Sequence, residues 1–264
     1  MSNPPNSINP KTQEEFAFVV TNFLMQTTNI QASNRTCRSA LKAAEPQLAA
    51  QDRHNLVELS GHPAVGDMVN GLVQKPGSEI FETIAKGITE NSLKGAMRNV
   101  DAAAIVFSHS LLDATLYTFC SLCHRVSPTD WLEFIGERKV KVSDLQVRTK
   151  ADLLFEKSKS YLDELERESL SVKANTLHAL CKPPPSPGYI KNYSYSSEGL
   201  EKFDTTRIGI VHAMQFKSPI QGVDAMLDFS QATGLYFAVM IARKYGLQMV
   251  AGNSFWNRLR AELA

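Results

Sequence analysis

The sequence predicts an all-α protein, a helical bundle of four to five long helices with an additional N-terminal helical region. Apolar residues recur at the three- and four-residue spacing of one helix face, first at Phe16, Val19, Val20, Phe23 and Leu24. Residues typical of helix ends flank several such segments. No segment alternates apolar and polar residues for long enough to predict a strand.

The composition is that of a globular protein with a core. Of the 264 residues 43% are hydrophobic, which excludes disorder as the main state. The 28 Lys and Arg nearly balance the 27 Asp and Glu, so the net charge gives no global indication of nucleic-acid binding but leaves a local site open. The longest apolar runs, 102–107 and 236–242, are far shorter than the roughly 18 to 20 residues of a membrane span, and we expect no membrane segment.

Neither a basic nor an apolar segment of the kind found in secretory signals occurs among the first residues. The four cysteines are too few and too unevenly spaced to predict a disulfide framework. We therefore expect a cytoplasmic protein with reduced thiols.

The N-terminal part is expected to be helical but interrupted. Residues 1–11 are polar and rich in proline and predict a flexible tail, and 12–100 form the N-terminal helical region, of unknown role. Proline and glycine punctuate 34–75, which predicts short helices separated by turns. Ser78 is placed to cap the next helix.

The bundle is expected over 101–250. Asp101 can cap a long helix that runs to about Val126, and Ser127 with Pro128 supplies a capping box and a first-turn proline for a short helix. A helix of unusual length is predicted over 152–180, and the prolines after Lys182 end it. That proline tract is interpreted as a rigid connector, although a ligand for a partner domain is an alternative.

Two further helices complete the predicted bundle. Ser197 can cap a helix that runs to about Phe216, and a last long helix over 223–245 ends at Gly246. Residues 251–264 are expected to form a short C-terminal helix.

The segment Cys120-Ser121-Leu122-Cys123-His124 matches the C-x-x-C-H pattern of covalent haem attachment. It lies within a periodic helix, and the chain offers no second ligand pair for zinc. We interpret both cysteines as buried thiols, because free cysteine is among the most often buried residues. No metal and no cofactor is expected, and the usual catalytic motifs of hydrolases, nucleotide-binding proteins and metalloproteases are missing from the sequence.

Arg207 and His212 lie five positions apart in the predicted helix after Ser197. A guanidinium binds phosphate while staying charged, and an imidazole gives and takes protons near neutral pH. The two groups meet the minimum for cleaving RNA by attack of a 2′-hydroxyl on its own phosphodiester. Five helical positions leave them about 140° apart, so a second copy of the helix would complete the site more easily.

This pattern resembles the HEPN superfamily of helical-bundle proteins, which includes prokaryotic RNA-cleaving toxins and defence proteins. The resemblance rests on R-x-x-x-x-H, with Ile210 and Val211 before His212, and on the order of helices over about 100–250. It implies a metal-independent endoribonuclease in which Arg207 and His212 are the catalytic pair, in a cleft between two protomers. The partners it implies are RNA, a second copy of the chain and an antitoxin or regulatory protein.

Ile208 departs from the family pattern, in which a polar residue often follows the arginine. The alternative function is therefore a non-catalytic helical module that binds RNA or a protein. A third interpretation makes Arg207 a surface residue and His212 a hydrogen-bonded, partly buried one.

Several other residues are candidates for supporting roles. His109 and Asp113 are four positions apart and could form a hydrogen-bonded pair facing the cleft or be an ordinary helix pair, and Asp204 precedes Arg207 by three positions. The basic run 137–141 could follow an RNA backbone or be a solvated surface. Bases could stack on three tyrosines, which could equally pack against the bundle: Tyr189, Tyr193 and Tyr195.

Overall fold

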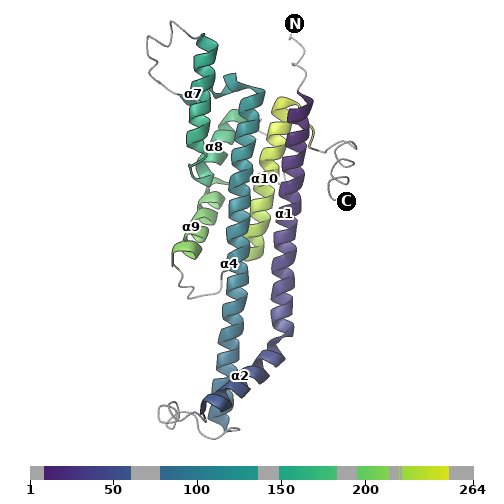
Figure 1. The fold of residues 1–264 in the computed structure, drawn as a ribbon, viewed down its shortest axis with the longest axis vertical. Coiled ribbons are helices and arrows are strands. Elements are labelled where there is room, and N and C mark those ends of the chain that lie inside the picture. The colour runs from purple at the N-terminus through teal and green to yellow at the C-terminus, as the bar shows by residue number, and fades with distance from the viewer. Residues whose placement is uncertain are drawn as a thin grey trace.

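The computed structural model describes residues 9–60, 78–135, 149–182, 195–213, 220 and 222–249, and every element within these ranges is helical, which confirms the all-α class (Figure 1). The predicted C-terminal helix 251–264, the basic run 137–141, the proline tract and Tyr189 and Tyr193 lie outside them. The elements are α1 (Pro10–Ala43), α2 (Glu45–Ser60), α4 (Glu79–Val126), the 3-10 turn η1 (Pro128–Trp131), α5 (Leu132–Ile135), α7 (Lys150–Leu165), α8 (Leu170–Cys181), α9 (Ser197–Ala213) and α10 (Val223–Tyr245).

Helix α1 begins where asparagine and proline make a helix start favourable. The Asn9 side chain accepts a hydrogen bond from the backbone N–H of Lys11 (2.9 Å), and Pro10 occupies the first turn, where no N–H is needed. Residues 10 and 11, predicted to belong to the tail, are therefore helical. The apolar face seen in the sequence is buried in the core, through Phe16, Val20 and Phe23.

Helix α4 is continuous over 48 residues and runs through the bundle centre (Figure 1). The predicted cap at Ser78 is confirmed, since its hydroxyl accepts from the backbone N–H of Phe81 at 3.3 Å. The predicted start at Asp101 is wrong: that residue is buried inside α4 and accepts a hydrogen bond from Nδ2 of Asn34 (3.0 Å). A boundary between residues 100 and 101 would cut this helix.

The N-terminal region is part of the bundle. Helix α1 packs against α4 and α10 along its first half, and its buried residues belong to the same cluster as Leu112, Leu116 and Phe237. At one crossing the ring of Phe23 lies directly on Gly234 of α10. The region 12–100 is thus not separate from the bundle, because the first half of α1 contributes to the bundle core.

The helix predicted over 152–180 is two helices. Thr149 and Asp152 form a capping box at the start of α7, and Ser169 begins α8 by accepting from the backbone N–H of Val172 (3.4 Å). The break lets both Leu165 and Leu170 enter the core.

Before η1 the predicted capping box is wrong, because the Ser127 hydroxyl caps no backbone N–H and lies 3.3 Å from the hydroxyl of Thr129.

The ends of the last two helices follow the sequence closely. Helix α10 has the predicted bounds and ends at Gly246, whose positive φ of 68° closes the helix. The α9 cap is Ser196 rather than Ser197, since the Ser196 hydroxyl accepts from Gly199 N–H at 3.0 Å. The described part of α9 ends at Ala213.

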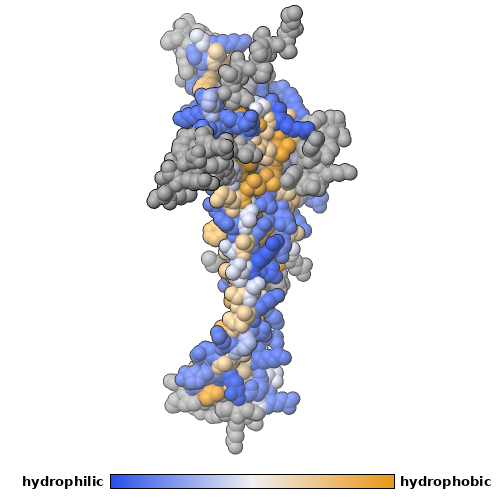
Figure 2. Space-filling model, turned by 90° about the vertical axis from the view of Figure 1, so that its right-hand side faces the viewer, coloured by the Kyte–Doolittle hydropathy of each residue, from blue (hydrophilic) through white to orange (hydrophobic). Residues whose placement is uncertain are grey.

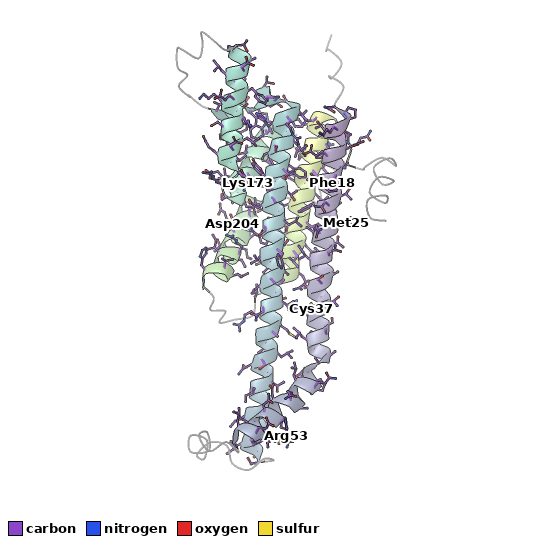
Figure 3. All side chains as sticks on the ribbon, viewed as in Figure 1. Phe18, Met25, Cys37, Arg53, Lys173 and Asp204 are labelled. Carbon is purple, nitrogen blue, oxygen red and sulfur yellow. The ribbon has the colours of Figure 1, made fainter. Side chains whose placement is uncertain are left out.

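The second half of α1, α2 and the first part of α4 extend beyond the other helices (Figure 1). The extension is held by a small buried group around Phe81 and by polar contacts, including Arg53 with Glu82 at 2.8 Å. In the view of Figure 2 the largest apolar area lies on the bundle part of the molecule rather than on the extension. Two apolar side chains on the bundle half of α1, Phe18 and Met25, are 44% and 54% exposed (Figure 3).

Among the described helices two, α4 and α10, are long and apolar enough to cross a membrane by length and composition. Half of the most apolar window of each is buried inside the structure, as in a core helix of a bundle. Two such helices are weak evidence for a membrane span, because a core helix passes the same test. The short apolar runs in the sequence did not indicate a span.

Acid is expected to destabilise this fold as the pH falls from about 7 to below the ordinary histidine pKa of about 6.5. Burial lowers the pKa of His124 and of His178, and at His124 Lys159 adds to the effect while Asp163 opposes it. Each imidazole binds a proton more readily in the unfolded chain, where its pKa is about 6.5, so stability is full above that pH and falls below it. Melting temperatures should drop as the pH is lowered across this range. The drop should be less steep in His124→Gln than in the native protein. An equal slope in both proteins would contradict the role assigned to His124.

Candidate functional site

Helix α9 carries the Arg-x4-His motif and lies on α4 and α8. Leu200 and Phe203 fix it to the core, where both are buried. Gly199 lets the ring of Phe229 approach, since a Cβ there would lie 2.6 Å from it. One side of α9 therefore faces the bundle, and the other side is exposed.

His109 of α4 and Asp204 of α9 are bonded to each other. His109 is 7% exposed, and its Nε2 donates to Oδ1 of Asp204. Its ring also packs on Phe203, with the ring centroids 5.3 Å apart. The pair ties α9 to α4 one turn before Arg207.

The predicted pair of His109 and Asp113 is wrong, although both residues lie on α4. Asp113 instead accepts from Nζ of Lys173 on α8, at 2.8 Å to each carboxylate oxygen. Sequence reasoning missed Lys173, which is only 2% exposed. Its position between Leu170 and Leu177, at helical spacing, was a signal for a buried cation that needs a carboxylate.

Removal of the Asp113 charge is expected to destabilise the protein. Asp113→Asn leaves the buried Lys173 ammonium without a carboxylate, and because Asp113 is partly exposed we expect a loss of about 1–2 kcal/mol. Urea unfolding measures this loss in the free energy of unfolding. Adding Lys173→Met removes the orphaned charge and should recover most of the loss; a further additive loss would contradict this account.

Arg207 is half-buried on α9, and its Nε is buried without a hydrogen-bond partner among the residues that the structure describes. No carboxylate in this part of the chain forms an ion pair with its guanidinium. The nearest acid along the helix, Asp204, is already bonded to His109. Because a partly buried cation is stabilised by an anion, this guanidinium is suited to bind one supplied from outside.

His212 is exposed near the end of α9. No hydrogen bond joins it to Arg207 within the described ranges, which agrees with the rotation of about 140° between the two positions. The interpretation of His212 as a partly buried residue is therefore wrong. One copy of the helix directs the two side chains of the motif to different sides.

The exposed side of α9 around His212 is apolar. Ile208 and Val211 are 48% and 41% exposed, and a Cβ at Gly209 would meet nothing within 4 Å. The surface formed by Ile208, Gly209, Val211 and His212 is called the α9 outer face below.

The thiols of the C-x-x-C-H segment are buried, as predicted. Cys120 and Cys123 are 0% exposed, and burial raises the pKa of both thiols well above the ordinary value. His124 is also buried and donates through Nε2 to the Ser158 hydroxyl (2.8 Å), which in turn donates to the Phe155 carbonyl (2.8 Å). In the described residues no group of three or more His, Cys, Asp and Glu could hold a metal ion.

Tyr195 packs against the bundle rather than standing free for a base. Its ring stacks on His178 and Tyr236, with centroids 4.9 and 5.9 Å away, and its hydroxyl donates to the Asn175 side chain. Of the two alternatives for this tyrosine, packing is the one observed.

No protein-family model matches this sequence, and neither the search of curated proteins nor that of solved structures found a significant match.

Proposed function

We propose that the protein is a metal-independent endoribonuclease of the HEPN type that acts as a homodimer. One observation carries the proposal: the half-buried Arg207 guanidinium has no carboxylate partner in the described part of the chain, while Asp204 beside it is held by His109. A cation with no carboxylate partner among the described residues is available to bind a phosphodiester.

Each residue of the motif has a defined chemical role in the proposed reaction. The His212 imidazole takes the proton of a ribose 2′-hydroxyl, whose oxygen attacks the adjacent phosphorus. The bond from phosphorus to the 5′-oxygen breaks, and that oxygen takes up a proton, leaving a 2′,3′-cyclic phosphate and a 5′-hydroxyl. Arg207 stabilises the negative charge that develops on the phosphoryl oxygens.

The proposed dimer brings together an Arg207 and a His212 from different chains, which one α9 helix directs to different sides. On the same helix Arg207 is half-buried and His212 is exposed, about 140° apart in direction, so in the proposed dimer a phosphate held by one Arg207 would meet the His212 of the partner. The α9 outer face offers an apolar contact surface, and Gly209 allows a close helix approach. An antitoxin or regulatory protein that covered this face would block the site.

The test is incubation of the purified protein with total RNA in EDTA. We expect cleavage, with product ends that carry 2′,3′-cyclic phosphate and 5′-hydroxyl groups. Intact RNA across structured, single-stranded and transfer RNA would overturn the enzyme and favour the alternative, a binding module, which the exposed Ile208 at the family's polar position supports. Cleavage that stops in EDTA would overturn the metal-independent chemistry.

A further inference from the structure

Two polar contacts tie α4 to the helices beside it. His109 donates to Asp204 of α9, and one turn farther along α4 Asp113 accepts from Lys173 of α8 at 2.8 Å. Lys173 and Asp204 lie on the same side of α4 (Figure 3). The acid and the base of each contact come from different helices, so packing decides which base each acid meets.

A second base lies on the same helix as Asp204. Arg207 follows it by three positions, and side chains with this spacing are about 60° apart in direction, which allows an ion pair. In the described ranges Arg207 forms no ion pair, and the Asp204 carboxylate is bonded to His109 instead. His109 and Arg207 are therefore competitors for one carboxylate.

His109 is held in place for this contact. It is 7% exposed, and its ring packs on Phe203 with the centroids 5.3 Å apart. The Asp204 side chain is 21% exposed, so its charge is only partly solvated and is stabilised by a donor. Without His109 the base on the same helix face is Arg207, because the buried Lys173 already has a carboxylate.

The Arg207 guanidinium has two nitrogens that a carboxylate or a phosphate can reach. Its Nε is buried without a partner, whereas the two Nη nitrogens are not buried and have no hydrogen bond among the described residues. A bond to Asp204 would occupy the Nη nitrogens and offset the charge of the guanidinium. An anion from outside and Asp204 therefore exclude each other at Arg207.

We propose that His109 is a positioning residue that regulates this site: it holds the Asp204 carboxylate away from Arg207 and so leaves the guanidinium available to a phosphate. Loss of the bond between His109 and Asp204 would turn Asp204 into an internal inhibitor. This role rests on the function proposed above only for the identity of the anion, a phosphodiester of RNA. The competition for Asp204 exists whether or not RNA is cleaved.

Phenylglyoxal, which modifies arginine side chains, measures the state of Arg207 without RNA. Mass spectrometry of the peptide that contains Arg207 gives the rate. We expect His109→Leu to slow the modification roughly threefold or more, because a carboxylate bonded to the guanidinium protects it. His109→Gln keeps a side-chain N–H donor and should react at the native rate.

A second substitution separates this role from a purely structural one. Asp204→Asn, added to His109→Leu, removes the competing charge and should restore the native rate of Arg207 modification. A structural defect caused by His109→Leu would not be repaired by a second change in the same contact. An unchanged rate in His109→Leu, or slowing that Asp204→Asn does not relieve, would overturn the proposal.

Asp113→Asn is the matched control. It weakens the neighbouring contact between α4 and α8 but leaves His109 and Asp204 in place, so Arg207 should react at the native rate. Equal slowing in Asp113→Asn and His109→Leu would show that loosened helices, rather than the released carboxylate, change Arg207. That result would also overturn the proposal.

RNA cleavage distinguishes this role from the function proposed above. If the native protein cleaves RNA, His109→Leu should slow cleavage in the same proportion as Arg207 modification, and Asp204→Asn should restore both. If the native protein leaves RNA intact, the endoribonuclease is overturned, while the phenylglyoxal rates still decide the role of His109.

Discussion

Arg207→Gln and His212→Gln should each lower the rate of RNA cleavage at least 100-fold, roughly, with the melting temperature unchanged. The first substitution removes the charge that holds the phosphate, and the second removes the proton-transferring group. Lys202→Gln is the matched control, because Lys202 is an exposed cation on the same helix. Cleavage assays on a defined RNA measure all three proteins, and equal losses in all would indicate only general charge attraction.

Mixing the two inactive variants tests whether the site is shared between protomers. In a mixed dimer, the chain that keeps Arg207 meets the partner that keeps His212, and one of the two sites is complete. Since half of randomly exchanged dimers are mixed, roughly a quarter of the native activity should return. No recovery after verified subunit exchange would place both groups of each site in one chain.

Gly234→Ala should lower the free energy of unfolding by about 3 kcal/mol, the largest stability effect that we expect. A Cβ at this position would lie closer than 3.0 Å to the ring of Phe23, and the ring is buried with little room to move. Urea unfolding monitored by circular dichroism measures the change, because the protein is helical.

Two further variants separate this steric clash from other effects of glycine. In the Phe23→Leu background the added methyl group has space, so Gly234→Ala should cost much less than in the native protein. Gly95→Ala is the control in α4, where a Cβ would meet nothing within 4 Å, and it should stabilise the helix by about 0.5–1 kcal/mol. Additive losses for Phe23→Leu and Gly234→Ala would contradict a direct contact.

Local signals in the sequence predicted much of the fold. The apolar face of α1, the cap at Ser78 and the stop at Gly246 follow from spacing and backbone preference, and all are confirmed. The errors arose where a tertiary contact decided the outcome. Asp101 has the chemistry of a cap but bonds to Asn34 of another helix, and no local pattern distinguishes the two uses.

The candidate site was predictable only in part. Arg207 and His212 could be found from their types and spacing, but the partners of His109 and Asp113 could not, because both bonds join helices distant in the sequence. Burial of Cys120 followed from its place in an apolar helix face. Among the described residues the Arg207 guanidinium has no carboxylate partner because Asp204 is bonded to His109, and that bond depends on how α4 and α9 pack.

Because α4 is continuous, it connects the far end of the extension to the bundle as one helix. Its 48 residues measure about 72 Å, and the 22 residues before Asp101 reach about 33 Å past the bundle. A tilt of about 5° at the bundle would move the end of α4 beside α2 by about 3 Å, because α4 is one continuous helix over this length. A molecule that pulled on this end could thus transmit displacement to the segment that carries His109 and, through Asp204, to α9.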